Sequence, residues 1–75
     1  MQTMTSNLVA RMNARLESYR KQLEMLETLL EEEMRQQHDQ RRMHYLRFLH
    51  QERCVFGFAA SELEELLYSV EGDRE

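Results

Sequence analysis

The sequence predicts an all-α protein: an antiparallel two-helix hairpin, coiled-coil-like, that is completed to a bundle by dimerisation or by a partner protein. Its 75 residues include no proline and only two glycines, and they are rich in the residues typical of long helices. Apolar side chains also recur at alternating steps of three and four in both halves of the chain. Such a stripe needs another helix to cover it.

Residues 1–75 are expected to form a single domain. A chain this short struggles to bury enough apolar surface to offset its conformational entropy without a metal, disulfides or another chain. Its one cysteine, Cys54, excludes an internal disulfide framework. Association with another chain is therefore expected. The lack of a signal peptide and of an apolar run of about 20 residues predicts a soluble, cytoplasmic protein without a membrane span.

The first helix is expected over residues 7–35. Thr5, Ser6 and Asn7 are favourable N-cap residues, and an apolar stripe begins directly after them. The stripe comprises Leu8, Met12, Leu16, Tyr19, Leu23, Leu26, Leu30 and Met34. It stops where the chain becomes almost entirely polar.

The second helix is expected over residues 40–70, with Asp39 as its N-cap. Its packing face is a heptad-spaced ladder: Leu46, Leu49, Arg53, Phe56, Ala60, Leu63, Leu67 and Val70. Gly72 and Asp73 are expected to end this helix as a C-terminal cap, followed by a frayed acidic tail over residues 71–75.

The middle of the second helix carries an apolar collar, residues 54–60, that covers its whole circumference. A single neighbouring helix covers one side only, so burial on more than one side is expected. Gly57 either permits the close approach of another backbone there or is a tolerated glycine without a role.

Two geometries fit these helices: a hairpin with a turn at residues 36–40, or one continuous helix. Extending the first stripe from Leu30 by two heptads reaches His44, whereas the second ladder passes through Leu46. Because the stripes are out of phase across the polar gap, the hairpin is favoured. No glycine or proline enforces the turn.

No catalytic site, metal site, cofactor or small-molecule substrate is expected. His38, His44 and His50 recur every six residues, which spreads them around a helix instead of stacking them as shared metal ligands. His50 and Cys54 lie four residues apart but lack further ligands. Cys54, inside the collar, is expected to be a buried, inert thiol.

Arginines and histidines between residues 41 and 53 give the start of the second helix a basic face, as a hairpin-dimer RNA-binding regulator would need. Residues 31–33 are three glutamates and are expected to form a solvated hairpin tip. Their carboxylates are expected to pair with these arginines and histidines and to weaken the attraction of the basic face to phosphate. Nucleic-acid binding is therefore disfavoured. Arg53, which stands on the ladder, is expected to reach water or to meet Glu17, Glu24 or an acid of a partner.

The first helix resembles part of a known family. Gln22, Leu23, Glu24 and Met25, followed by Thr28, Leu30 and Met34, are similar to the corresponding stretch of the small YscE-type co-chaperones of type III secretion needle subunits. The resemblance implies a two-helix hairpin that joins a larger helical-repeat co-chaperone, the pair sequestering the needle subunit in the cytosol. The Phe56-Gly57-Phe58 collar and the turn without Gly or Pro depart from the pattern expected for that family.

The predicted function is that of a non-enzymatic protein-binding module, a small cytosolic chaperone, co-chaperone or regulator that sequesters a helical partner. A structural coiled-coil subunit of a larger assembly is the alternative, ahead of the RNA-binding regulator. Binding is expected through the second helix, residues 40–70, to a partner protein, to a second copy or to both. The expected partner-binding residues are Phe56, Phe58, Leu63, Leu66, Leu67 and Val70.

Overall fold

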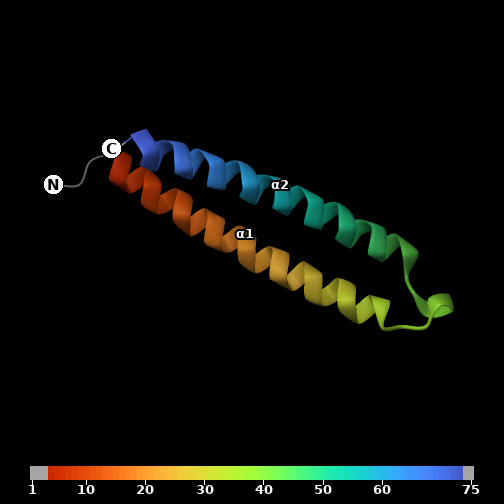
Figure 1. Cartoon of the computed structure of the whole chain (residues 1–75). Coiled ribbons are helices and arrows are strands. Elements are labelled where there is room, and N and C mark those ends of the chain that lie inside the picture. Colours follow the sequence, from red (N-terminus) through yellow and green to blue (C-terminus); the bar gives the residue numbers. More distant parts are fainter. Residues whose placement is uncertain (1–3, 74–75) are drawn as a thin grey trace.

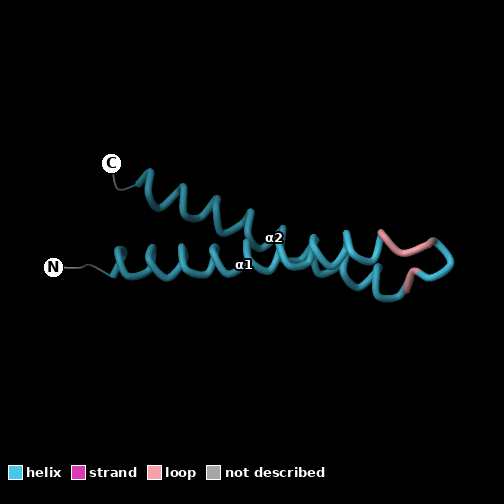
Figure 2. The backbone as a smooth tube through the Cα atoms, turned by 90° about the horizontal axis from the view of Figure 1, so that it is seen from below, coloured by secondary structure: helices cyan, strands magenta, loops and turns pink. Residues whose placement is uncertain are grey.

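The computed structural model describes residues 4–73, which form two long antiparallel helices joined by a short turn (Figure 1). Helix α1 spans Met4–Met34, the single 3₁₀ turn η1 spans His38–Gln40, and helix α2 spans Met43–Asp73. The axes are inclined, so α1 and α2 overlap near the turn and lie apart near the open end in Figure 2. The predicted all-α hairpin is confirmed.

Two clusters of buried apolar side chains hold the helices together. The turn-end cluster consists of Leu26, Leu30, Leu46 and Leu49, and the open-end cluster consists of Leu16, Ala60 and Leu67. Phe56 packs against the turn-end cluster and Tyr19 against the open-end cluster, and their ring centroids lie 6.0 Å apart in a tilted arrangement. This aromatic pair therefore joins the two clusters into one continuous interface.

The ladder on α2 faces α1 as predicted, because its seven apolar positions are all buried or half-buried. Arg53 leaves the interface at its edge and places Nη2 3.5 Å from a carboxylate oxygen of Glu27. The expected acids Glu17 and Glu24 are therefore not its partners. The antiparallel register brings Arg53 level with Glu27, and both side chains keep half of their surface in water.

The stripe on α1 is confirmed in its middle and wrong at its ends. Leu8 is 51% exposed and Met34 is 48% exposed, while Val9 packs against the open-end cluster in place of Leu8. A series of buried and half-buried positions of α1 alternates strictly in steps of three and four, beginning at Val9 and ending at Glu33. The predicted stripe instead steps by four from Leu8 to Met12 and from Leu30 to Met34, so its terminal positions lie beside the contact.

Both helix starts differ from the predicted ones. Because α1 already runs from Met4, Ser6 and Asn7 lie within its first turns and not at its N-cap. Helix α2 starts at Met43 and not near residue 40, and Asp39 lies inside η1, so Asp39 does not cap α2. Short polar side chains favour a cap position locally, but at the start of α2 it is the carboxylate of Glu33 that accepts the backbone N–H of Arg42.

The end of α2 also lies later than predicted. Residues 71–73 are helical, and Gly72 has no positive φ, so it does not form the left-handed C-terminal cap expected for glycine. The remainder of the predicted frayed tail, residues 74 and 75, lies outside the described residues.

Arg41 closes the end of α1. Its guanidinium donates from Nη2 to the carbonyl oxygen of Met34 at 3.0 Å and from Nε to that of Gln36 at 3.1 Å. The last carbonyls of a helix have no partner within the helix, and a cation is favourable there. A side chain from beyond the turn thus does what a glycine cap does in many hairpins.

Glu33 closes the start of α2, so the prediction that residues 31–33 are all solvated is wrong. Its side chain is 6% exposed; one carboxylate oxygen accepts the backbone N–H of Arg42 at 2.8 Å and the other accepts the guanidinium at 2.9 Å. The side-chain hydrogen bond from Arg42, followed by the backbone one, holds the pKa of Glu33 below its ordinary value. The Arg42 guanidinium also lies over the Tyr45 ring, 4.3 Å from its centroid.

Candidate partner-binding surface

The structure divides the six predicted partner-binding residues into two groups. Phe56, Leu63 and Val70 are half-buried and Leu67 is buried; these four are rungs of the ladder that faces α1. The other two are open to solvent, and Phe58 is 69% exposed and Leu66 55% exposed. The single neighbouring helix α1 therefore does not cover all six, as the sequence indicated, and the part of the predicted surface that stays open to solvent lies around Phe58 and Leu66.

Leu66 belongs to a second heptad-spaced series on α2, which we call the α2 outer stripe. It comprises Phe48, Glu52, Val55, Ala59, Glu62 and Leu66. Phe48, Val55 and Leu66 are each more than half exposed, and Phe58 adjoins the stripe one turn from both Val55 and Glu62. The alternating steps of three and four are present in the sequence, but the neighbouring ladder has seven apolar positions and gives the stronger periodic signal.

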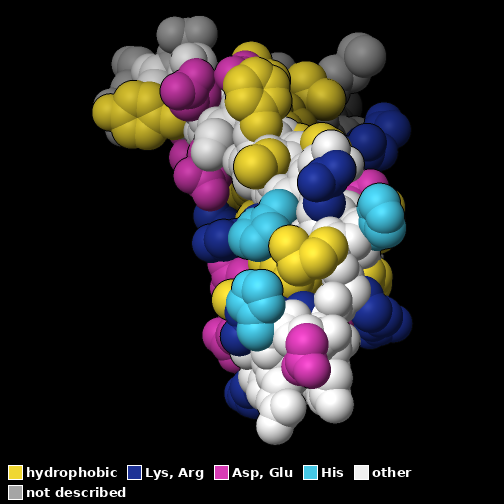
Figure 3. Space-filling model, turned by 90° about the vertical axis from the view of Figure 1, so that its right-hand side faces the viewer, with side chains coloured by type: hydrophobic (Ala, Val, Ile, Leu, Met, Phe, Trp, Pro, Cys, Tyr) yellow, Lys and Arg dark blue, Asp and Glu magenta, His cyan; other side chains and the backbone are white. Residues whose placement is uncertain are grey.

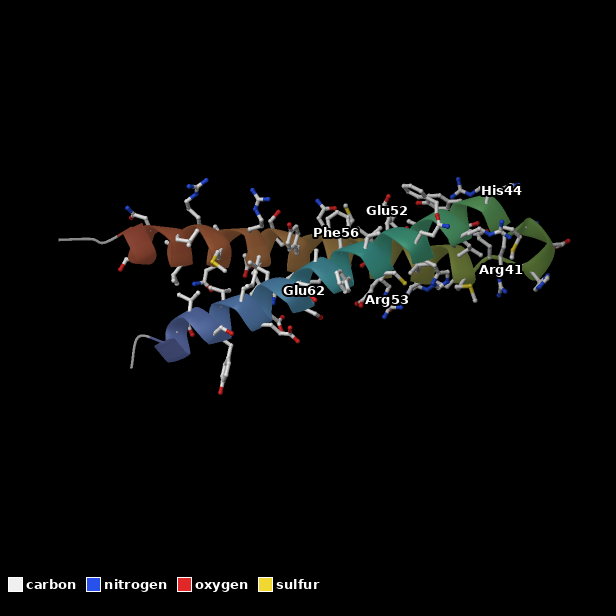
Figure 4. All side chains as sticks on the ribbon, turned by 90° about the horizontal axis from the view of Figure 1, so that it is seen from above. Arg41, His44, Glu52, Arg53, Phe56 and Glu62 are labelled. Atoms are coloured by element: carbon white, nitrogen blue, oxygen red, sulfur yellow. The ribbon has the colours of Figure 1, made fainter. Side chains whose placement is uncertain are left out.

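Among the described residues, the α2 outer stripe runs along the edge of the hairpin that carries no ion pair between α1 and α2. On the opposite edge Arg53 pairs with Glu27, and Arg20 pairs with Glu64 at 3.1 Å. In Figure 4 Glu52 and Arg53 extend from opposite edges of α2. One edge of the hairpin is thus closed by charged pairs, and the other presents apolar side chains.

Helix α1 has a corresponding series on the same edge, which we call the α1 outer stripe. It comprises Leu8, Arg11, Arg15, Ser18, Gln22, Met25 and Leu29. Leu8 and Met25 are half-exposed, and Leu29 is partly buried against the turn-end cluster. A shallow hollow of about 710 Å³ lies along its first half, between Leu8 and Tyr19. The two outer stripes together form one open face.

The charges on the open face are segregated by helix. The α1 outer stripe carries Arg11 and Arg15, and the α2 outer stripe carries Glu52 and Glu62. None of these four makes an ion pair within the described part of the chain. The basic and the acidic stripe are therefore both available to groups of the opposite charge.

The histidines and the cysteine do not form a site. His38, His44, His50 and Cys54 are exposed, so the prediction of a buried thiol is wrong. Among residues 4–73 no three His, Cys, Asp or Glu side chains come together as a metal site would require. A Cβ added at Gly57 would meet nothing within 4 Å, so the close backbone approach that its position suggested is absent from the hairpin.

The turn end of the molecule, which faces the viewer in Figure 3, gathers histidines and arginines around apolar side chains. A shallow pocket of about 410 Å³ lies there, lined by Met34, His38, Arg41, Met43, Leu46, Arg47 and His50. The guanidinium of Arg41 is engaged with the end of α1, and that of Arg42 with Glu33. Two of the arginines at the turn are therefore already engaged within the chain, so fewer positive charges remain available to a ligand than the sequence suggests.

Over residues 4–73 no helix is both long and apolar enough to cross a membrane. Comparison of the chain with protein-family models, with curated proteins and with solved structures finds no match. The open face formed by the two outer stripes is accordingly assigned from the geometry of this chain.

Proposed function

We propose that the protein is a non-enzymatic binding module that holds an amphipathic helix of a partner protein on the α2 outer stripe. The observation that carries the proposal is the continuous exposure of Phe48, Val55, Phe58 and Leu66 along a helix whose other face is already covered by α1. Apolar stripes of this length on small proteins mark interaction sites. Aromatic side chains such as Phe58 are frequent energetic anchors of these contacts.

The chemistry of the stripe restricts the partner. A helix that lies along it presents apolar side chains at steps of three and four to meet Val55 and Leu66. Glu52 and Glu62 interrupt the apolar surface without an ion partner of their own. The complementary helix therefore carries lysines or arginines beside its apolar stripe, which fixes its register as well as its charge.

The resemblance of the first helix to YscE-type co-chaperones suggests a specific partner and cellular role for this binding module. In that role the hairpin works in the cytosol together with a helical-repeat co-chaperone and sequesters a needle subunit of a type III secretion system. The two-helix hairpin supports this version, since the resemblance implies that fold. A structural coiled-coil subunit would use the same open face but would hold its partner permanently.

The proposal is tested with two synthetic helical peptides that share the same apolar heptads, one with lysines and one with glutamates at the flanking positions. Fluorescence anisotropy of the labelled peptides measures their affinity for the full chain. We expect the lysine peptide to bind and the glutamate peptide to bind at least about tenfold more weakly, a difference of about 1.4 kcal/mol.

Three variants locate the binding surface. Phe58→Asp and Leu66→Asp should each abolish binding of the lysine peptide, because a buried unpaired carboxylate is costly. Tyr68→Asp is the control, since Tyr68 is 81% exposed and lies off the stripe. Circular dichroism should show the same helix content in all three. Equal affinity of both peptides, or unchanged binding by Phe58→Asp and Leu66→Asp, would refute the proposal.

A further inference from the structure

We infer that a second copy of this chain covers the open face, with the α1 outer stripe of each copy packed on the α2 outer stripe of the other. The result is a four-helix bundle whose two-fold axis runs parallel to the helices. This inference concerns the same surface as the proposed function. It says that a second copy of the chain covers the open face when no partner helix is bound there. It does not require that a partner helix exists.

The small size of the core favours such an occupant. Within the described residues seven apolar side chains are buried, and five of the larger apolar residues on the two outer stripes are exposed by half or more. These five are Leu8, Met25, Phe48, Val55 and Leu66. A chain of this length rarely gains enough stability from a single thin interface. Packing two open faces together buries apolar side chains on both copies at once.

Charge decides which helices meet. If α2 packed on α2 of the second copy, Glu52 and Glu62 would meet only acidic or apolar side chains of the other stripe. If α1 packed on α1, Arg11 and Arg15 would meet each other. The mixed contact instead sets Arg15 of one copy against Glu62 of the other, and Glu52 lies beside Met25 and Leu29 instead of another acid. Like charges across such a contact are destabilising and opposite charges are favourable.

Because the two-fold axis is parallel to the helices, each residue lies at the same level along the bundle axis in both copies. In the hairpin Leu16 packs beside Ala60 and Leu67, so Arg15 of the second copy comes level with the segment that contains Glu62 and Leu66. In the same way Leu30 packs in the cluster with Leu46 and Leu49. Leu29 of the second copy therefore comes level with Phe48, and the apolar ends of the two stripes coincide.

The ion-pair edge agrees with this assignment. Arg20 with Glu64 and Arg53 with Glu27 already join the helices on the opposite side of the hairpin. Those pairs hold half-exposed side chains that gain nothing from further burial. The open face has unpaired charges of both signs and exposed apolar groups. A second copy on this face would pair Arg15 with Glu62 and bury the apolar groups.

Sedimentation equilibrium of the full chain over the micromolar range tests the inference. We expect twice the 9.2 kDa mass of the chain. Arg15→Glu and Glu62→Arg should each raise the dissociation constant by about tenfold or more, and the double variant should restore it. Glu71→Arg is the matched control, because it makes the same charge change at an exposed position one heptad after Glu64, on the ion-pair edge, and should leave the mass unchanged.

Each result has one meaning. A monomer at every concentration would overturn the inference, and so would a dimer that Glu62→Arg does not weaken or that the double variant does not restore. The proposed function fails separately, when the lysine peptide does not bind. If a dimer forms and the lysine peptide also binds, the peptide should lower the mass of the protein toward that of one chain, since both occupy the α2 outer stripe.

Discussion

At the scale of single residues, charged side chains do the work that glycine and proline usually do in a helical hairpin. Arg41 reaches back to the carbonyls at the end of α1, and Glu33 reaches forward to the backbone N–H of Arg42 at the start of α2. Each helix end is thus capped by a residue from the other side of the turn. This reciprocal capping fixes the turn although every described residue in it has negative φ.

Glu33→Gln should destabilise the hairpin at neutral pH, because the carboxylate accepts charge-assisted hydrogen bonds from Arg42. The pKa of Glu33 is lowered by folding from its ordinary value of 4.5. Its stabilising effect is therefore fully present above about pH 4.5 and is lost as the pH falls through the lower folded pKa. Thermal melts of the wild type and the variant should differ at pH 7 and converge in acid.

The matched control for that experiment is Glu32→Gln, since Glu32 is exposed and makes no ion pair in the described structure. Its melting temperature should follow the wild type at every pH. A constant difference between Glu33→Gln and the wild type from pH 7 to pH 3 would show that the carboxylate does not titrate with folding.

Phe56→Ala should lower the free energy of unfolding by about 2 kcal/mol. A fully buried Phe typically loses about 3 to 5 kcal/mol on truncation, and Phe56 is half-buried beside Tyr19. Urea unfolding followed by circular dichroism measures the change. Phe58→Ala is the control, because its ring is 69% exposed and its effect on the hairpin should stay within about 0.5 kcal/mol.

At the scale of the helices, the sequence predicted the parts that depend on periodicity and missed the parts that depend on tertiary contacts. The ladder through Leu49 and Leu67 could be predicted because burial against a partner helix demands a regular spacing. The burial of Glu33 and the capping by Arg41 could not, since they depend on the path of the turn. The same holds for Phe58 and Leu66, whose exposure could be assigned only once the face covered by α1 was known.

Gly57→Ala should stabilise α2 by about 1 kcal/mol, because glycine is that much less favourable than alanine inside a helix. Apart from its chain neighbours and the nearby backbone of α2, the added methyl group meets no atom within 4 Å, and the position has no positive φ. Thermal unfolding should therefore shift upward by several degrees. Gly72→Ala, close to the end of α2, should give a smaller gain. A loss of stability at Gly57 would reveal a second backbone packed there.

At the scale of the whole molecule, the out-of-phase stripes explain why the chain turns back at all. In one straight helix the two stripes would face different directions, and neither could cover the other. Folding at residues 35–42 brings them into contact and leaves a pair of outer stripes on one edge. The same contacts could in principle form between two extended chains, as in domain swapping. The capped turn favours contacts within one chain.

Spin labels at Ser18 and Glu65, both exposed, should report a short distance within one chain. The sample combines doubly labelled protein with an excess of unlabelled protein, so that distances between copies do not contribute. In one continuous helix these positions would lie about 70 Å apart at 1.5 Å per residue. In the hairpin they lie on neighbouring helices near the open-end cluster, and pulsed electron paramagnetic resonance should find them within about 25 Å, two helix diameters plus the label arms. A distribution centred near the longer distance would show that the stripes pair between extended chains.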